Sequence, residues 1–203
     1  MSKIKLTKEE VQRIAKINGN VHGSILKAYY QFIIDNIGDD GAKKVEKRLK
    51  ELGLKITFKD AFTFKWYPKA YSSLICIAFL EIAGWDEKDA FKVGYAAPAY
   101  SLLTKILMKY FSTERILQNA NFYWRKHFDF GEMKCVEYDK EKRYAILRLY
   151  GFKKYHQTVY IYILGYLTRL IEMTTKSKNV KVKQIKSLFS GDSYDEFKVE
   201  WKT

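Results

Sequence analysis

The chain has 203 residues, of which 47% are hydrophobic and 30% are charged. These values fit a folded protein with a sizeable core and exclude a collagen-like, low-complexity or largely disordered chain. The formal net charge of +14 suggests attraction to anions, such as nucleic acid, acidic lipid or an acidic small molecule. Because the lysines are spread along the whole sequence and form no single basic arm, the pattern argues against direct nucleic-acid binding.

The chain contains two cysteines, Cys76 and Cys135, and no CxxC motif. The sequence therefore predicts neither a disulfide framework nor a zinc site, and a reducing cytoplasm is the natural compartment. The opening segment MSKIKLTKEE lacks the apolar core of a secretory signal. The most apolar stretches, near 71–83 and 159–167, are too short and too rich in tyrosine to span a bilayer, so we expect no transmembrane segment.

The first two-thirds of the chain are predicted to be helical. A capping-box pattern that begins at Thr7 opens a helix ending near residue 17. Apolar residues recur at helical spacing over 21–37, and Gly38 is expected to stop that helix. A third, lysine-rich helix is predicted over about 41–52.

The middle of the chain mixes extended and helical signals. Residues 54–67 alternate like a strand or an extended segment, and Pro68 can start a helix that Gly84 ends. Helical spacing resumes after Asp86, with Pro98 marking a break, a kink or a fresh start. A helix restarts at 112 and is expected to run to about 127. Beyond Pro98 we expect an apolar helix face made of Leu102, Leu103, Ile106, Leu107 and Tyr110.

The last third changes to a strand pattern. EMKCVEYD at 132–139 and the segment 143–152 read as strands joined by a polar turn, and 179–187 with 194–202 read as a hairpin about Gly191. A helix is predicted over 159–173. The order predicts an α+β fold: N-terminal helices followed by a β-β-α-β-β unit with a four-stranded, mainly antiparallel sheet. We expect a single domain, 1–203, with a mainly helical part (1–128) and a sheet part with one helix (129–203).

The helix predicted over 159–173 is apolar almost all round. Such a helix must be covered on two faces. We expect the sheet on one face, and the N-terminal helices, a second subunit or a ligand on the other. Gly165 inside this helix costs about 1 kcal/mol relative to alanine, and we expect close packing to compensate.

Three segments carry a resemblance to known proteins: FYWRKHFDFGEMKCVEYD (122–139), Gly165 within YIYILGYLTRLIE, and SLFSGDSYDEFKVEW (187–201). Together they resemble the 4-vinyl reductase (bacteriochlorophyll-type) ligand-binding domain family and a related myxobacterial paralogous family. More distantly, the layout is similar to TRAPP vesicle-tethering subunits and to haem-binding H-NOX domains. The resemblance covers about 110–203, and for the earlier residues only the helical layout is similar.

The resemblance implies a small-molecule-binding scaffold that acts as a sensory or regulatory module and is often a homodimer. Many members carry metal-binding cysteines around the terminal turn, where this chain has Ser187 and Asp195. Neither is a soft ligand, so we do not transfer a metal-binding role.

Candidate site residues come from the aromatic-basic segment and from tyrosines elsewhere. Among His22, His127 and His156, His127 is the best candidate for a haem ligand because it lies beside two phenylalanines. The alternative is a partly exposed histidine at the end of a helix, where a cation is favourable. The predicted ligand-binding residues are Tyr71, Tyr100, Trp124, Arg125, His127 and Tyr162.

In this prediction Trp124 offers a stacking surface, and Arg125 offers a two-pronged donor for a carboxylate. The alternative is that Trp124 anchors its helix on the sheet while Arg125 is solvated. No catalytic or nucleotide-binding motif occurs, so we expect a non-enzyme. The leading hypothesis is a sensory domain that holds a small hydrophobic or aromatic-acidic ligand between helices and sheet. The alternatives are a structural adaptor, a haem-based gas sensor of the H-NOX type and, with least support, a tetrapyrrole vinyl reductase.

Overall fold

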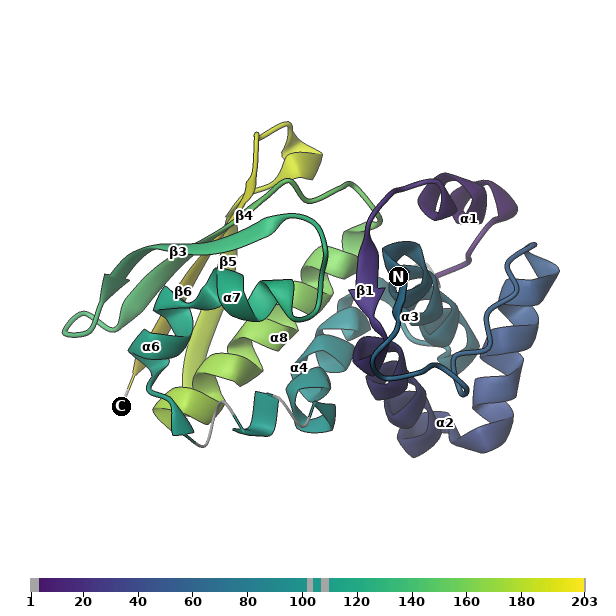
Figure 1. Ribbon diagram of the computed structural model, residues 1–203, viewed down its shortest axis with the longest axis horizontal. Coiled ribbons are helices and arrows are strands. Elements are labelled where there is room, and N and C mark those ends of the chain that lie inside the picture. The colour runs from purple at the N-terminus through teal and green to yellow at the C-terminus, as the bar shows by residue number, and fades with distance from the viewer. Residues whose placement is uncertain (1–3, 102–103, 107–109, 203) are drawn as a thin grey trace.

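The computed structural model describes residues 4–101, 104–106 and 110–202, and it forms a helical part packed against a twisted sheet (Figure 1). One cluster of buried apolar side chains continues from the N-terminal helices into the sheet. The two parts therefore share one hydrophobic core.

The N-terminal helices follow their local sequence signals. Helix α1 (Lys8–Ala15) begins with the predicted capping box, in which the Thr7 side chain accepts from the backbone N–H of Glu10 and the Glu10 side chain accepts from that of Thr7. Helix α2 (Gly23–Glu51) continues past Gly38, whose φ of 71° and ψ of 178° break the helical geometry at the predicted place. The two predicted helices are therefore one element with a sharp kink.

Helix α3 (Lys69–Ala83) starts directly after Pro68 and ends at Gly84, which has a left-handed conformation, as predicted. The extended pattern over 54–67 gives regular structure only at its end, where β2 (Trp66–Pro68) pairs antiparallel with β1 (Asn20–His22). The sequence did not predict β1, because three residues carry too little periodicity to signal a strand.

The predictions for the segment between 86 and 127 need correction. After the short 3-10 helix η1 (Glu87–Asp89), helix α4 (Ala90–Tyr100) contains Pro98 within its final turn and continues past it. The helix predicted from 112 to 127 is divided at Asn119 into α6 (Thr113–Gln118) and α7 (Ala120–Arg125). In the expected apolar face, Leu102, Leu103 and Leu107 lie outside the described residues, and Ile106 and Tyr110 are exposed.

The sheet confirms the predicted α+β class. Its strands are β3 (Glu132–Asp139), β4 (Tyr144–Tyr150), β5 (Asn179–Lys186) and β6 (Asp195–Lys202), in the order β3-β4-β6-β5. Each neighbouring pair is antiparallel. The predicted terminal turn contains the short helix η2 (Leu188–Ser190), and Gly191 closes it with a positive φ of 96°.

Helix α8 (Gln157–Thr175) lies between α4 and the sheet, so both of its apolar faces are covered by its own chain (Figure 1). The approach to α4 depends on two glycines. A Cβ atom on Gly165 would lie 2.1 Å from the carbonyl oxygen of Phe91, and one on Gly94 would lie 1.9 Å from that of Tyr162. Close packing at Gly165 is thus confirmed, and no second subunit is required to cover α8.

Candidate functional site

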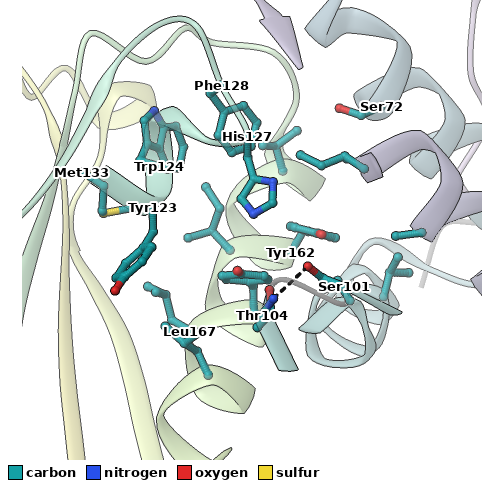
Figure 2. Close-up of a pocket in the computed structure, with 18 of the residues that line it drawn as sticks. Ser72, Ser101, Thr104, Tyr123, Trp124, His127, Phe128, Met133, Tyr162 and Leu167 are labelled. Carbon is teal, nitrogen blue, oxygen red and sulfur yellow. Dashed lines mark hydrogen bonds between the residues drawn. The ribbon is translucent and has the colours of Figure 1, made fainter. Parts of the chain in front are cut away.

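A cavity of about 180 Å³ lies where the helices meet the sheet. Helices α2, α3, α4, α6, α7 and α8 and strands β3 and β4 all contribute side chains to this helix–sheet cavity, and Figure 2 shows several of these side chains. The wall is mostly apolar and includes Ile25, Phe32, Val93, Ile116, Leu117, Met133, Leu147, Phe152, Val159, Ile163, Leu167 and Leu170.

The volume limits what the cavity can hold. An engineered apolar cavity of about 150 Å³ stays dry and binds benzene. The helix–sheet cavity is slightly larger, so as it stands it accommodates one aromatic ring with a short substituent. Pockets for drug-sized ligands are larger, at about 300–1,000 Å³.

The imidazole of His127 projects into the cavity toward Tyr162 and Thr104 (Figure 2). Its backbone is fixed on both sides: the N–H donates to Trp124 O at 2.9 Å, and the carbonyl accepts from the N–H of His22 at 2.9 Å. Its Nδ1 atom is buried and has no hydrogen-bond partner among the described residues. Burial, with a smaller effect of His22, lowers the pKa of His127 to about 4.

His127 is therefore a neutral imidazole with a free nitrogen at neutral pH. The structure does not support His127 as a cation at a helix end. The residue is half-buried after α7, as that interpretation required, but burial keeps its imidazole neutral and the ring projects into the cavity. A buried nitrogen without a partner costs stability unless a ligand or water supplies the missing hydrogen bond.

Trp124 combines the two roles that the sequence left open. Its ring lines the cavity, while its Nε1–H donates to Phe130 O at 2.8 Å and its ring stacks on Phe128 with centroids 4.2 Å apart. The indole thus anchors α7 beside the sheet and also presents one face to the cavity. Its N–H is already engaged and is not available to a ligand.

Three tyrosines line the side of the cavity formed by α2 and α8. Tyr29 and Tyr162 stack with ring centroids 5.9 Å apart, and Tyr162 and Tyr166 stack at 6.4 Å. Burial raises the pKa of all three phenols, so each hydroxyl stays protonated at neutral pH. Together with Thr104 they give this apolar wall a row of hydroxyl groups.

Lys69 is the only lysine or arginine among the described lining residues of the cavity. It is 5% exposed, and its Nζ donates to Ser73 Oγ at 2.7 Å. Burial lowers the pKa of Lys69 to about 7. Lys69 was not among the predicted site residues, because a lysine after Pro68 at a helix start gives no sign of burial in the sequence. In the structure the next eleven residues of α3 are all buried except Tyr71, so even the first side chain of the helix meets the core.

The structure brings together only some of the predicted site residues. Trp124, His127 and Tyr162 line the cavity, whereas Tyr71, Tyr100 and Arg125 are not among its described lining residues. Tyr71 packs against the core, and the Tyr100 hydroxyl donates to Asp35 Oδ2 at 2.7 Å. Arg125 is exposed and donates to Asp129 O at 2.9 Å, so the carboxylate-binding role suggested for it lacks the required position. A role in ligand binding stays a prediction for the three that line the cavity.

The terminal turn does not resemble a metal site. Asp195 is fully buried, its Oδ1 accepts from Gln184 Nε2 and from the N–H of Leu188, and burial raises its pKa to about 6. Ser187 Oγ accepts from the N–H of Phe189. In the part of the chain that the structure describes, no three His, Cys, Asp or Glu side chains gather as they would around a metal ion.

Comparison with solved structures shows an H-NOX-like fold. The chain matches the crystal structure of an H-NOX protein from S. oneidensis in the Fe(II)NO ligation state, with a TM-score of 0.68 and 10% identity over 90% of this chain and 99% of that chain. It also matches an oxygen-binding H-NOX domain related to soluble guanylate cyclases (TM-score 0.62, 13% identity, 89% and 95% covered). An Fe(II) unliganded H-NOX protein from K. algicida gives a TM-score of 0.60 at 10% identity, with 90% and 97% covered.

The likeness to H-NOX structures extends over the N-terminal helices, which the sequence resemblance had not reached. No protein-family model and no curated protein sequence matches the chain. Among the described residues, no helix has the length and apolar character needed to cross a membrane.

Since this fold carries haem in some proteins, the residues must be tested against that group. His127 fits an axial ligand, because its imidazole is neutral, half-buried and projects into the cavity. The rest of the site does not fit. A cavity of about 180 Å³ is far too small for a tetrapyrrole, and the described lining offers a single cation, Lys69, for two propionates.

Proposed function

We propose that this protein is a non-catalytic sensory or regulatory domain that binds a small, largely apolar ligand in the helix–sheet cavity. The observation that carries the proposal is the apolar cavity into which the neutral imidazole ring of His127 projects. The H-NOX-like fold supports the sensory class, since its solved representatives include an oxygen complex and an NO complex.

The position of the cavity suggests how binding could be transmitted. Its wall joins α4 and α8, whose backbones touch at Gly94 and Gly165, to α7 and the sheet. A ligand that fills the cavity contacts elements on both sides of the interface, so it favours one relative position of helices and sheet.

The experiment compares one-ring probes in a cavity-filling variant and a surface control. Ala97 on α4 lines the cavity, and Ala99 two residues later is exposed. Toluene or phenol at about 100 times its Kd should stabilise the wild type by about 2.7 kcal/mol in thermal unfolding. Ala97→Leu should abolish this shift, and Ala99→Leu should retain it.

Two results would overturn the proposal. The first is a panel of one-ring and two-ring probes that leaves the wild-type melting temperature unchanged. The second is an Ala97→Leu variant that circular dichroism shows to be folded and that still binds a probe as tightly as the Ala99→Leu variant.

Haem-based gas sensing is the second candidate, favoured by the fold and by His127. We expect the purified chain, mixed with haemin under oxidising and reducing conditions, to show no stoichiometric Soret complex, because the cavity is too small. A tight complex that His127→Leu eliminates would replace the first proposal by this one.

The finer sequence predictions remain proposals. Kinship with 4-vinyl reductase-type domains is supported by the terminal turn and strand, which form as that resemblance implies. A cytoplasmic location is supported by the free thiols of Cys76 and Cys135. The adaptor role loses its original motivation, because α8 is covered within one chain, whereas the homodimer rests on the family resemblance alone. Light scattering over a concentration series tests it.

A further inference from the structure

Lys69 carries a buried amine that has no counter-ion among the described residues. Its Nζ contacts Ser73 Oγ and lies 4.6 Å from the centroid of the Tyr155 ring, and neither group is negatively charged. None of the ion pairs formed by the described residues includes Lys69. A lysine with 5% exposure is normally paired with a carboxylate.

The titratable groups around Lys69 do not supply the missing charge. On α3 itself, burial raises the pKa of the Cys76 thiol to about 12, and Tyr29 of α2, which faces that thiol, is a neutral phenol. Tyr155, before α8, is also kept neutral by burial. Asp129, an acid that acts on neighbouring Tyr155, is already engaged: it accepts from the backbone N–H and the side-chain amide of Asn20, both at 2.6 Å.

The ammonium group retains donors for a ligand. An ammonium carries three N–H groups, and Ser73 accepts one of them. Lys69 lines the same cavity as His127 and the tyrosine hydroxyls. A carboxylate placed there gains a charge-assisted hydrogen bond inside a low-dielectric site, where such bonds are strongest.

We propose that the ligand of the helix–sheet cavity is a one-ring aromatic carboxylic acid, with its carboxylate on Lys69 Nζ and its ring in the apolar part of the cavity. This inference rests on the proposed function and names the ligand class of the same site. Size and polarity lead to it together. About 180 Å³ of mainly apolar space holds one ring, and the buried amine of Lys69 has no anion beside it among the described residues. Lys69 thereby takes the role that the sequence analysis gave to Arg125.

The test measures Kd by calorimetry for benzoate and for toluene, its neutral counterpart without the carboxylate. Three proteins are compared: the wild type, Lys69→Met and Lys65→Met, which removes an exposed lysine four residues away. Benzoate should bind the wild type and Lys65→Met equally and should bind Lys69→Met about 30-fold or more weakly, since truncating one partner of a buried charge pair typically costs that much. Toluene should bind all three within about twofold.

A pH series on the wild type gives a readout that does not depend on any variant folding. Benzoate requires the protonated amine, which the free protein loses above pH 7. Its affinity should therefore fall by up to about tenfold per pH unit above pH 7. Toluene affinity should stay flat.

The outcomes separate this inference from the proposed function. Toluene binding with no preference for benzoate and no pH dependence would overturn the acid-binding role of Lys69 and leave the cavity's function standing. Absence of binding by either probe would remove both.

Discussion

The contact between α4 and α8 gives the sharpest prediction about stability. Gly94→Ala would place a Cβ atom 1.9 Å from Tyr162 O and 2.7 Å from Tyr162 C. Carbon contacts in proteins lie at about 3.5–4.0 Å, so α4 and α8 must separate by about 1.5 Å to admit this atom. The obstacle is backbone of a packed helix, which cannot rotate away as a side chain can.

The magnitude follows from two opposing effects. Overpacking of a filled interior costs about 1–3 kcal/mol and occasionally more. Replacing a helical glycine by alanine returns about 1 kcal/mol of helix propensity. Because the contact is with backbone, we take the upper part of the first range and expect a net loss of about 2 kcal/mol in the free energy of unfolding.

Urea denaturation followed by circular dichroism measures this loss. With a slope of about 2–3 kcal/mol/M, the midpoint should fall by about 0.7–1 M. Gly41→Ala is the matched control: Gly41 is also buried in a helix, but the atoms its Cβ meets belong to the flexible Ile37 side chain, so its midpoint should fall less. The double variant Gly94→Ala/Gly165→Ala should lose less than the sum of the single losses, because the first separation makes room for the second. A Gly94→Ala protein as stable as the wild type would refute the close approach of these helices.

Three further predictions concern single side chains. The pKa of Asp195 is raised from 3.8 to about 6 in the folded protein, so the wild type loses stability as the pH rises from 4 to 6. In thermal melts the Asp195→Asn variant should therefore be more stable than the wild type by about 2–3 kcal/mol at pH 8. At pH 3 the two proteins should be about equally stable. The NMR signals of the His127 ring should not titrate between pH 5.5 and 8, and a midpoint near 6.5 would contradict its burial. Thr7→Ala should cost about 1 kcal/mol in urea unfolding while Thr7→Ser costs little, and equal losses would show that the cap contributes nothing.

The predictions that succeeded rest on signals within a few residues. The capping box at Thr7, the αL residue at Gly84 and the turn at Gly191 each depend on short-range backbone chemistry that a sequence displays directly. The strand and helix periods of the last third likewise report which residues of one element face the core. This periodicity predicted the α+β class and the need for other elements to cover two faces of α8.

The sequence alone could not locate the cavity. Its described lining residues come from helices, strands and the segments between them, and they meet only because α4 and α8 approach closely. Gly94 permits this approach against the backbone of Tyr162, and Gly165 permits it against the backbone of Phe91. Periodicity assigned Lys69 to a helix start but could not show that this start lies inside the core. It also placed Arg125 next to Trp124, although the helix turns the guanidinium to solvent and the indole to the cavity. A residue's local pattern determines its element, whereas its chemical environment is decided by packing between elements distant in the chain.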